Sequence, residues 1–249
     1  MTADGPKLYN ELAGWYHLLT APEDYEEEAA FYSNLLREAT DGELKTVLEL
    51  GSGGGNNALY MKANFEMVLT DLSEEMLALS QTINPDLEHI QGDMRTLRLG
   101  RTFDAVFVHD AVCYMTTEED LQSAIETAAA HCRDGGGVVI APDYVRETFR
   151  ESNDTGGHDG ADGRGLRYME WCRDPGDGST AYVTDFAYML READGSVRVV
   201  HDRHVDGLFP RATWLRLMEG WGLETRVTPL VHSEVEPGVH EVFVGRKRR

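Results

Sequence analysis

The chain has 249 residues, enough for one α/β domain with an added lobe. Its 23 Lys and Arg stand against 44 Asp and Glu, and the net charge of −21 argues against nucleic acid as a partner, because phosphate contacts need a basic surface. There is no run of 18 apolar residues and residues 1–10 are polar, so we expect neither a membrane span nor a secretory signal.

Residues 10–40 are expected to be largely helical. Apolar side chains recur at near-helical spacing over residues 25–37, and Pro22 just ahead suits a helix start. Gly42 then breaks the helix before the first strand.

A glycine-rich turn follows that strand. The sequence Thr-Val-Leu-Glu-Leu-Gly-Ser-Gly-Gly-Gly-Asn-Asn begins at Thr46. Gly51 permits a tight reversal, Gly53 lets the backbone approach a ligand, and Gly55 lets a helix begin close to the strand. The turn can seat a nucleoside-bearing cofactor, and Glu49 could accept a hydrogen bond from a ligand ammonium.

The turn departs from two better-known glycine motifs. Ala58 is not the third glycine of a dinucleotide fingerprint, and no Gly-Lys-Ser/Thr of a P-loop follows. Taken alone, the pattern is also compatible with an ordinary strand-to-helix turn.

Further strands are expected at residues 65–71, 87–90, 103–110 and 135–142, with a helix over 118–132 before the last of them. Alternation of strands and helices favours a parallel sheet with right-handed crossovers. Asp71 lies roughly 20 residues after the turn, as a ribose-binding carboxylate does. Ser73 is a good N-cap for the next helix. Ligands bind outside the carboxyl edge of such a sheet.

The composition changes at residue 151. Residues 153–165 are rich in Gly and Asp and predict a long polar loop. Antiparallel strands are expected over 166–173, 180–191 and 197–208, a helix over 210–221, and strands over 223–230 and 240–245.

The predicted fold is therefore α/β: a Rossmann-like, mostly parallel, doubly wound sheet with an antiparallel edge strand, and a small antiparallel β lobe. We divide the chain into N-terminal helices and a Rossmann-like core (1–150), a β-rich insert (151–209), and a C-terminal helix with strands that complete the core sheet (210–249).

Histidines supply candidate chemistry. His109 ends the fourth strand, where a neutral imidazole could accept a proton near pH 7, or could be a satisfied histidine near the sheet edge. On the strand over 197–208, Asp202 and His204 share one face. His158 lies near two aspartates, but their irregular spacing predicts no metal site.

The ordered motifs resemble those of class I S-adenosylmethionine-dependent methyltransferases over about residues 9–143. They are Glu49-x-Gly51-x-Gly53-x-Gly55, Asp71, Gly92-Asp93-Met94 and Phe103-Asp104-Ala105-Val106. A nearly end-to-end likeness links the chain to bacterial N,N-dimethyltransferases of nucleotide-linked amino sugars. It includes Leu12-Ala13-Gly14-Trp15-Tyr16, Gln91-Gly92-Asp93-Met94-Arg95, His204 and Phe243-Val244-Gly245.

One departure concerns the acceptor. Those enzymes carry a basic residue just before the final strand, suited to a diphosphate. This chain reads Gly238-Val239-His240-Glu241-Val242 there, with an acid in place of the cation.

The resemblance implies S-adenosylmethionine as cofactor and in-line methyl transfer to nitrogen or oxygen of a small-molecule acceptor. It also implies that residues 1–150 bind the cofactor and that the β-rich insert over 151–209 caps the active site and its substrate. The implied catalytic residues are Tyr16, His109 and Tyr114. The implied cofactor contacts are Glu49, Gly51, Ser52, Gly53, Asn56, Asp71, Leu72, Met76, Gly92, Asp93, Met94, Val108 and His109. The implied substrate contacts are Tyr25, His158, Arg167 and His204. Tyr16 could instead be a core tyrosine beside Trp15, and Arg167 could simply pair with an acid.

Two other functions fit the sequence less well. A nicotinamide-dependent oxidoreductase would need a Tyr-x-x-x-Lys or similar relay, and the chain has none. A non-catalytic nucleoside-binding module would not need the complete glycine motif. Cys113, Cys132 and Cys172 are odd in number and show no metal-like spacing. They predict no disulfide framework, which is typical of the reducing cytoplasm, so we expect a cytoplasmic protein. The sequence is compatible with a homodimer but does not predict the oligomeric state.

Overall fold

The computed structural model describes residues 5–249 and contains two β-sheets. The larger has seven strands in the order β10-β11-β5-β4-β1-β2-β3. Their bounds are β1 Thr46–Leu50, β2 Glu66–Asp71, β3 Glu88–Gln91, β4 Phe103–His109, β5 Cys132–Ala141, β10 Leu223–Pro229 and β11 Glu241–Lys247. Strands β1 to β5 run parallel, and β11 lies antiparallel between β5 and β10.

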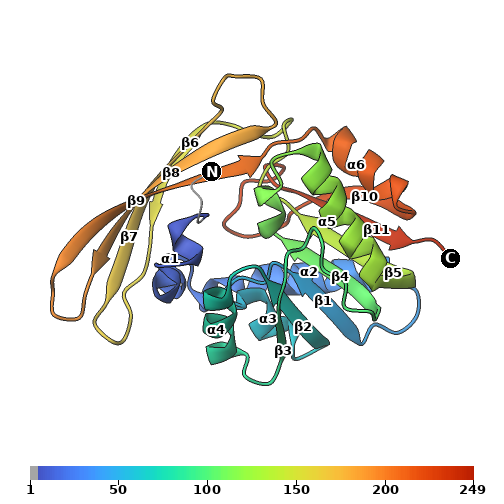
Figure 1. The fold of residues 1–249 in the computed structure, drawn as a ribbon, viewed down its shortest axis with the longest axis horizontal. Coiled ribbons are helices and arrows are strands. Elements are labelled where there is room, and N and C mark those ends of the chain that lie inside the picture. Colours follow the sequence, from blue (N-terminus) through green and yellow to red (C-terminus); the bar gives the residue numbers. More distant parts are fainter. Residues whose placement is uncertain (1–4) are drawn as a thin grey trace.

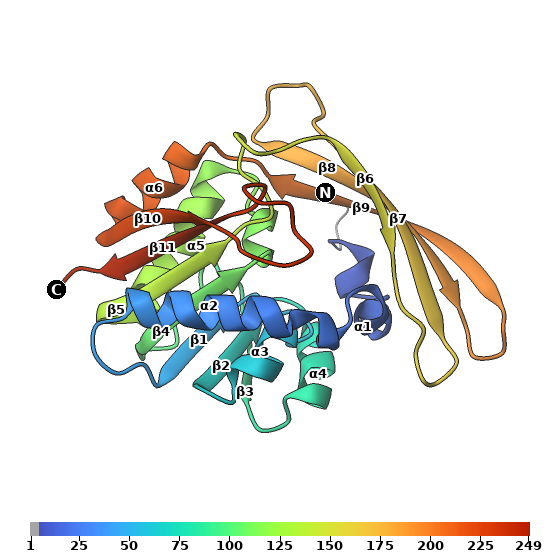
Figure 2. The same ribbon diagram turned by 180° about the vertical axis from the view of Figure 1, so that it is seen from behind.

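Helices cover both faces of this sheet (Figures 1 and 2). Helices α2 (Glu26–Ala39) and α3 (Asn56–Met61) pack on one face, where they bury Val47, Leu69 and Phe107. Helices α5 (Glu118–His131) and α6 (Arg211–Gly220) pack on the other. Successive side chains of a strand point to opposite faces of the sheet. Since helices cover both faces, the central strands carry apolar residues on both.

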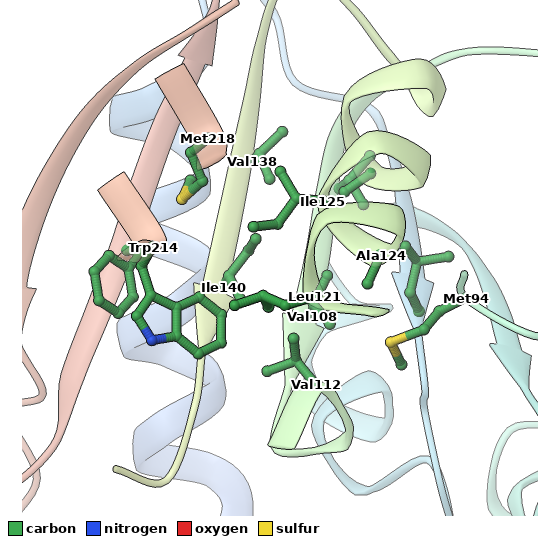
Figure 3. Packing of buried hydrophobic residues seen from close by; sticks show 14 of the residues in the cluster. Met94, Val108, Val112, Leu121, Ala124, Ile125, Val138, Ile140, Trp214 and Met218 are labelled. Atoms are coloured by element: carbon green, nitrogen blue, oxygen red, sulfur yellow. The ribbon is translucent and has the colours of Figure 1, made fainter. Parts of the chain in front are cut away.

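The second face forms the larger apolar core. Figure 3 shows Trp214 and Met218 of α6 against Val138 and Ile140 of β5, with side chains of α5 beside them. Helix α4 (Glu74–Ile83) begins at the predicted cap, since the Ser73 hydroxyl accepts a hydrogen bond from the Met76 amide.

The smaller sheet has the antiparallel order β6-β7-β8-β9. It comprises β6 Ser152–Gly156, β7 Gly165–Arg173, β8 Ala181–Arg191 and β9 Val197–Gly207. The predicted fold class, a mostly parallel sheet with a separate antiparallel one, is confirmed. The prediction of a loop throughout 153–165 was wrong at its start, because β6 is a polar edge strand held by backbone pairing to β7.

The N-terminal segment is a chain of short turns rather than one long helix. It contains η1 (Lys7–Tyr9), η2 (Ala13–Trp15), α1 (Tyr16–Leu19) and η3 (Pro22–Tyr25). It lies between the small sheet and the core (Figure 1). The Leu8 amide donates to Asp202 of β9, and the Ser73 hydroxyl donates to the Tyr9 carbonyl. Within residues 5–249, no helix has the length and apolar character needed to cross a membrane.

Candidate active site

The glycine turn leaves β1 in a conformation that requires glycine. Gly51 has a φ of +73°, and a Cβ there would overlap the Ala111 side chain and lie 2.8 Å from the Met94 methyl. The amides of Gly51 and Ser52 both donate to the Thr70 carbonyl of β2 at 2.8 Å. The turn is therefore held tightly against the carboxyl edge of the sheet.

Two buried polar groups at this turn lack partners among the described residues. They are Oε2 of Glu49 and Oγ of Ser52, on side chains that are 3% and 8% exposed. Burial, followed by the charges of Asp71 and Glu28, raises the pKa of Glu49 to about 8. Because a buried carboxyl without a partner is unfavourable, this position fits a ligand that brings an ammonium group.

Asp71 lies on the other side of the turn. Its carboxylate accepts hydrogen bonds from the amides of Gly53 at 2.8 Å and Ser73 at 2.9 Å, while burial raises its pKa. Leu72 beside it is 65% exposed, a large apolar side chain open to a flat ligand. These residues fit the ribose and base of a nucleoside.

The other predicted cofactor contacts differ in how they are placed. Met76 and Met94 lie against the turn, and Asn56 leaves its buried Oδ1 without a partner among residues 5–249. Asp93 instead accepts three hydrogen bonds from the Arg95 guanidinium, which lower its pKa. Two further positions pack inward, since Gly92 is held against Leu97 and Val108 lies in the apolar core.

A cavity of about 300 Å³ opens beside the turn. Its walls come from the N-terminal segment, the ends of β4 and β5, and the small sheet. The polar side chains that line it include Tyr9, Tyr16, Tyr25, Asp110, Tyr114, Asp143, Glu170, His204, Asp206 and His240. Tyr16 joins cavity and turn, because its Oη lies 3.5 Å from a Cβ built on Gly53.

Tyr114 is fixed by a chain of hydrogen bonds. Its Oη lies 2.8 Å from Tyr9 Oη and 2.8 Å from His204 Nδ1. His204 Nε2 is 3.2 Å from Asp202 Oδ2, and both side chains are buried. The predicted shared face of Asp202 and His204 is confirmed, and it points inward.

His109 does not line this cavity. Its ring lies toward α2, where it packs against Tyr32 and Phe107, with Nδ1 3.4 Å from the Asn57 amide nitrogen. Its Nε2 is 3.0 Å from Asp110 Oδ1. The structure thus brings Tyr16, Tyr25, Tyr114 and His204 together and leaves His109 behind Asp110.

The remaining predicted substrate residues lie farther out. His158 lines a second, more open cavity of about 550 Å³, which shares Glu170 with the first. Its Nε2 is 3.4 Å from Asp24 Oδ2. Arg167 lines neither cavity, since its guanidinium pairs with Asp159 at 2.9 Å.

Most of the cavity's carboxyl groups were not among the site residues predicted from the sequence. Asp110 follows β4 with a φ of +42°, the only positive φ of a non-glycine among residues 5–249, and such strain is typical of functional positions. Its side chain lines the cavity. Removal from bulk water, followed by repulsion from Asp143 and Glu28, raises its pKa. Asp206 could have been found, because it continues the alternation of Asp202 and His204 along β9.

Residues 47–136 match a family model described as a methyltransferase domain. The dTDP-3-amino-3,4,6-trideoxy-alpha-D-glucopyranose N,N-dimethyltransferase of Streptomyces venezuelae is 30% identical over 224 residues, covering 89% of this chain and 91% of the relative.

Solved structures agree. The crystal structure of Streptomyces venezuelae DesVI superposes with a TM-score of 0.81 at 29% identity, over 95% of this chain and 97% of that one. The S-adenosylmethionine-bound structure of CalS10, an amino pentose methyltransferase from Micromonospora echinaspora, gives 0.74 at 23% identity, over 90% and 91%. The chain therefore belongs to the S-adenosylmethionine-dependent methyltransferases, with dTDP-amino-sugar N,N-dimethyltransferases among its homologues, and S-adenosylmethionine is its cofactor.

Proposed function

We propose that the protein methylates the nitrogen of a small-molecule amine related to an amino sugar, in bacterial secondary metabolism. The observation that carries the proposal is the cavity beside the glycine turn, walled by Tyr16 on one side and by Asp110 on another. The names of the related enzymes, which are N,N-dimethyltransferases of amino sugars, favour nitrogen over oxygen.

Residues at the turn would hold the cofactor. The unpartnered carboxyl of Glu49 would accept from its ammonium group, and Asp71 would accept from the ribose hydroxyls. Leu72 and Met94 would flank the adenine, with Asp93 beside them. When bound, S-adenosylmethionine supplies a methyl group already activated by its positively charged sulfur.

The protein's own part is alignment and proton removal. The new N–C bond forms in line as the C–S bond breaks, with the bonding pair leaving on sulfur, so the amine must present a free lone pair. The tyrosines that wall the cavity would orient the amine and exclude water.

We assign proton acceptance to Asp110 and a positioning role to His109. Asp110 reaches the cavity, and its raised pKa makes it a better proton acceptor than an ordinary aspartate. His109 is held between Asn57 and Asp110 and would orient that carboxylate. This proposal differs from the prediction from sequence, in which the imidazole of His109 accepts the proton.

The experiment compares an amino sugar with the same sugar carrying a hydroxyl in place of the amine. Each is incubated with enzyme and S-adenosylmethionine labelled with ¹³C in its methyl group, and the product is read by NMR and mass spectrometry. We expect an N-methyl signal from the amine and none from the hydroxyl compound. Label on oxygen, or on neither compound, would contradict the proposal.

A further inference from the structure

The acceptor cavity has an unusual charge for an enzyme related to those acting on nucleotide-linked sugars. Four of its lining side chains are carboxylic acids, Asp110, Asp143, Glu170 and Asp206. Within the described part of the chain, neither this cavity nor the more open one beside it is lined by a lysine or arginine. A diphosphate in such surroundings would meet like charge and no counter-charge.

Asp206 is a second observation that points to a positively charged ligand. It is 6% exposed, lines the cavity, and has no hydrogen bond or ion pair with any described residue. Burial, then the nearby charge of Asp143, raises its pKa well above the usual range. A buried carboxyl left without a partner is unfavourable until a ligand supplies one.

The arginines near the cavity are already neutralised. Arg211, the first residue of α6, donates two hydrogen bonds of 2.7 and 2.6 Å to Glu241. Arg167 pairs with Asp159. Arg203 pairs with Asp185 on the outer face of the small sheet. His240, just before β11, forms a hydrogen bond through Nδ1 with the backbone carbonyl of Asp143.

The carboxyl groups also extend outward from the reaction centre. Asp110 lies beside the glycine turn, whereas Glu170 lines both cavities and so lies where they meet. Burial and the charges of Asp154 and Asp143 raise the pKa of Glu170 to about 7. No three His, Cys, Asp or Glu side chains among residues 5–249 are arranged to hold a metal ion, which favours an organic cation.

We infer that the acceptor is a phosphate-free amine carrying at least two positively charged nitrogens. One nitrogen is methylated beside Asp110 and Tyr16, and another is held by Asp206 and Glu170. The tyrosines of the cavity add favourable contacts, because aromatic faces attract cations. This inference rests on the proposed N-methyltransferase function and narrows its substrate class.

The test titrates protein loaded with S-adenosylhomocysteine by calorimetry with three probes. They are a dTDP-linked 3-amino-3,6-dideoxyglucose, its methyl glycoside, and a methyl 2,3-diamino glycoside. We expect the diamine to bind about tenfold or more tightly than the monoamine, since a charged hydrogen bond is gained, and the nucleotide-linked sugar to bind most weakly. The dTDP-linked sugar binding as tightly as its methyl glycoside, or no binding by any amine, would overturn the inference.

Binding and turnover separate the two proposals. A diamine that binds tightly but is never methylated would refute the proposed function and leave the ligand class standing. A dTDP-linked sugar methylated with the highest kcat/KM would support the function and overturn the ligand class.

A matched pair of variants locates the effect. Asp206→Asn should abolish most of the tighter binding of the diamine while leaving S-adenosylhomocysteine affinity unchanged. Glu192→Gln makes the same charge change in the same lobe at a half-exposed side chain outside both cavities, and should bind all probes as the wild type does. Should Asp206→Asn fail to fold, Glu170→Gln carries the same test. Unchanged diamine preference in the folded variant would contradict the assignment.

Discussion

At the scale of single residues, Glu49 shows how a ligand site can be unfavourable in the ligand-free protein. Its pKa of about 8, against an ordinary 4.5, means that the folded chain holds a proton which the unfolded chain has released between these pH values. The stability of the ligand-free protein should therefore fall as pH rises from about 4.5 to about 8.

Glu49→Gln removes this pH-dependent loss. We expect the variant to gain thermal stability over the wild type, and to gain more at pH 8.5 than at pH 5.5. Its affinity for S-adenosylhomocysteine should fall about tenfold or more, because a charged hydrogen bond is lost. Thermal unfolding and calorimetry measure the two effects. Glu224→Gln, at an exposed site on β10, is the control, and an equal stability change at both pH values would argue against a buried ionising Glu49.

The roles of Asp110 and His109 differ in how they respond to pH. In Asp110→Asn, only the amine's own loss of a proton can supply a free lone pair. The rise of kcat on the acidic side of its pH profile should therefore move to higher pH. The maximal rate should drop about a hundredfold. His109→Gln keeps a hydrogen-bond donor for Asp110, so kcat should fall less and the acidic side of its pH profile should not move. A profile that moves in His109→Gln and stays in place in Asp110→Asn would identify the His109 imidazole as the base.

Single residues were predictable where they belong to a contiguous motif. Glu49, Gly51 and Asp71 lie at strand ends whose order along the chain sets their order along the sheet edge. The direction of His109 was available too, because it shares a strand face with Phe107, which packs on α2. Asp206 was available from the alternation of Asp202 and His204 along β9. Asp143 could not be assigned, since no local pattern tells a cavity-facing acid from a core-facing one.

At the scale of elements, the strands of the large sheet and helix α2 followed from their apolar patterns, whereas the division of the N-terminal segment into short helices did not. Its helical residues are divided among turns, and α1 has only four residues. This segment contacts the small sheet through Leu8 to Asp202 of β9, and the cofactor-binding core through Tyr9 to Ser73, the N-cap of α4. Strand β6 escaped prediction because its polar side chains carry no alternation and only its backbone binds β7.

The N-terminal segment should become more protected when the cofactor site fills. Tyr16 lies over the glycine turn, and His17 Nε2 is 3.2 Å from the Gly54 carbonyl, so a ligand at the turn would add contacts to the same segment. We expect S-adenosylhomocysteine to slow amide hydrogen exchange over residues 7–25 more than over β10, which is remote from the turn. Equal slowing in both regions, or none in the first, would contradict a role for this segment in covering the cofactor.

At the scale of the whole molecule, charge and architecture support one substrate class. The net charge of −21 would attract cationic ligands from solution by long-range electrostatics, and the acidic cavity would then bind them. Composition alone left this acidity open as a solubility feature, because it does not say where the acids lie. Folding brings acids that follow β4 and β5 to the same cavity as acids of β7 and β9, which are far away in the sequence.

The most direct measurement is a crystal structure of the protein with S-adenosylhomocysteine and a methyl-accepting diamine. We predict the ammonium of the first ligand at Glu49, its ribose at Asp71, and an amine nitrogen of the second in the cavity within hydrogen-bonding distance of Asp110. A second nitrogen should meet Asp206 or Glu170. An acceptor bound outside the cavity, or a cofactor product bound away from the glycine turn, would contradict this account.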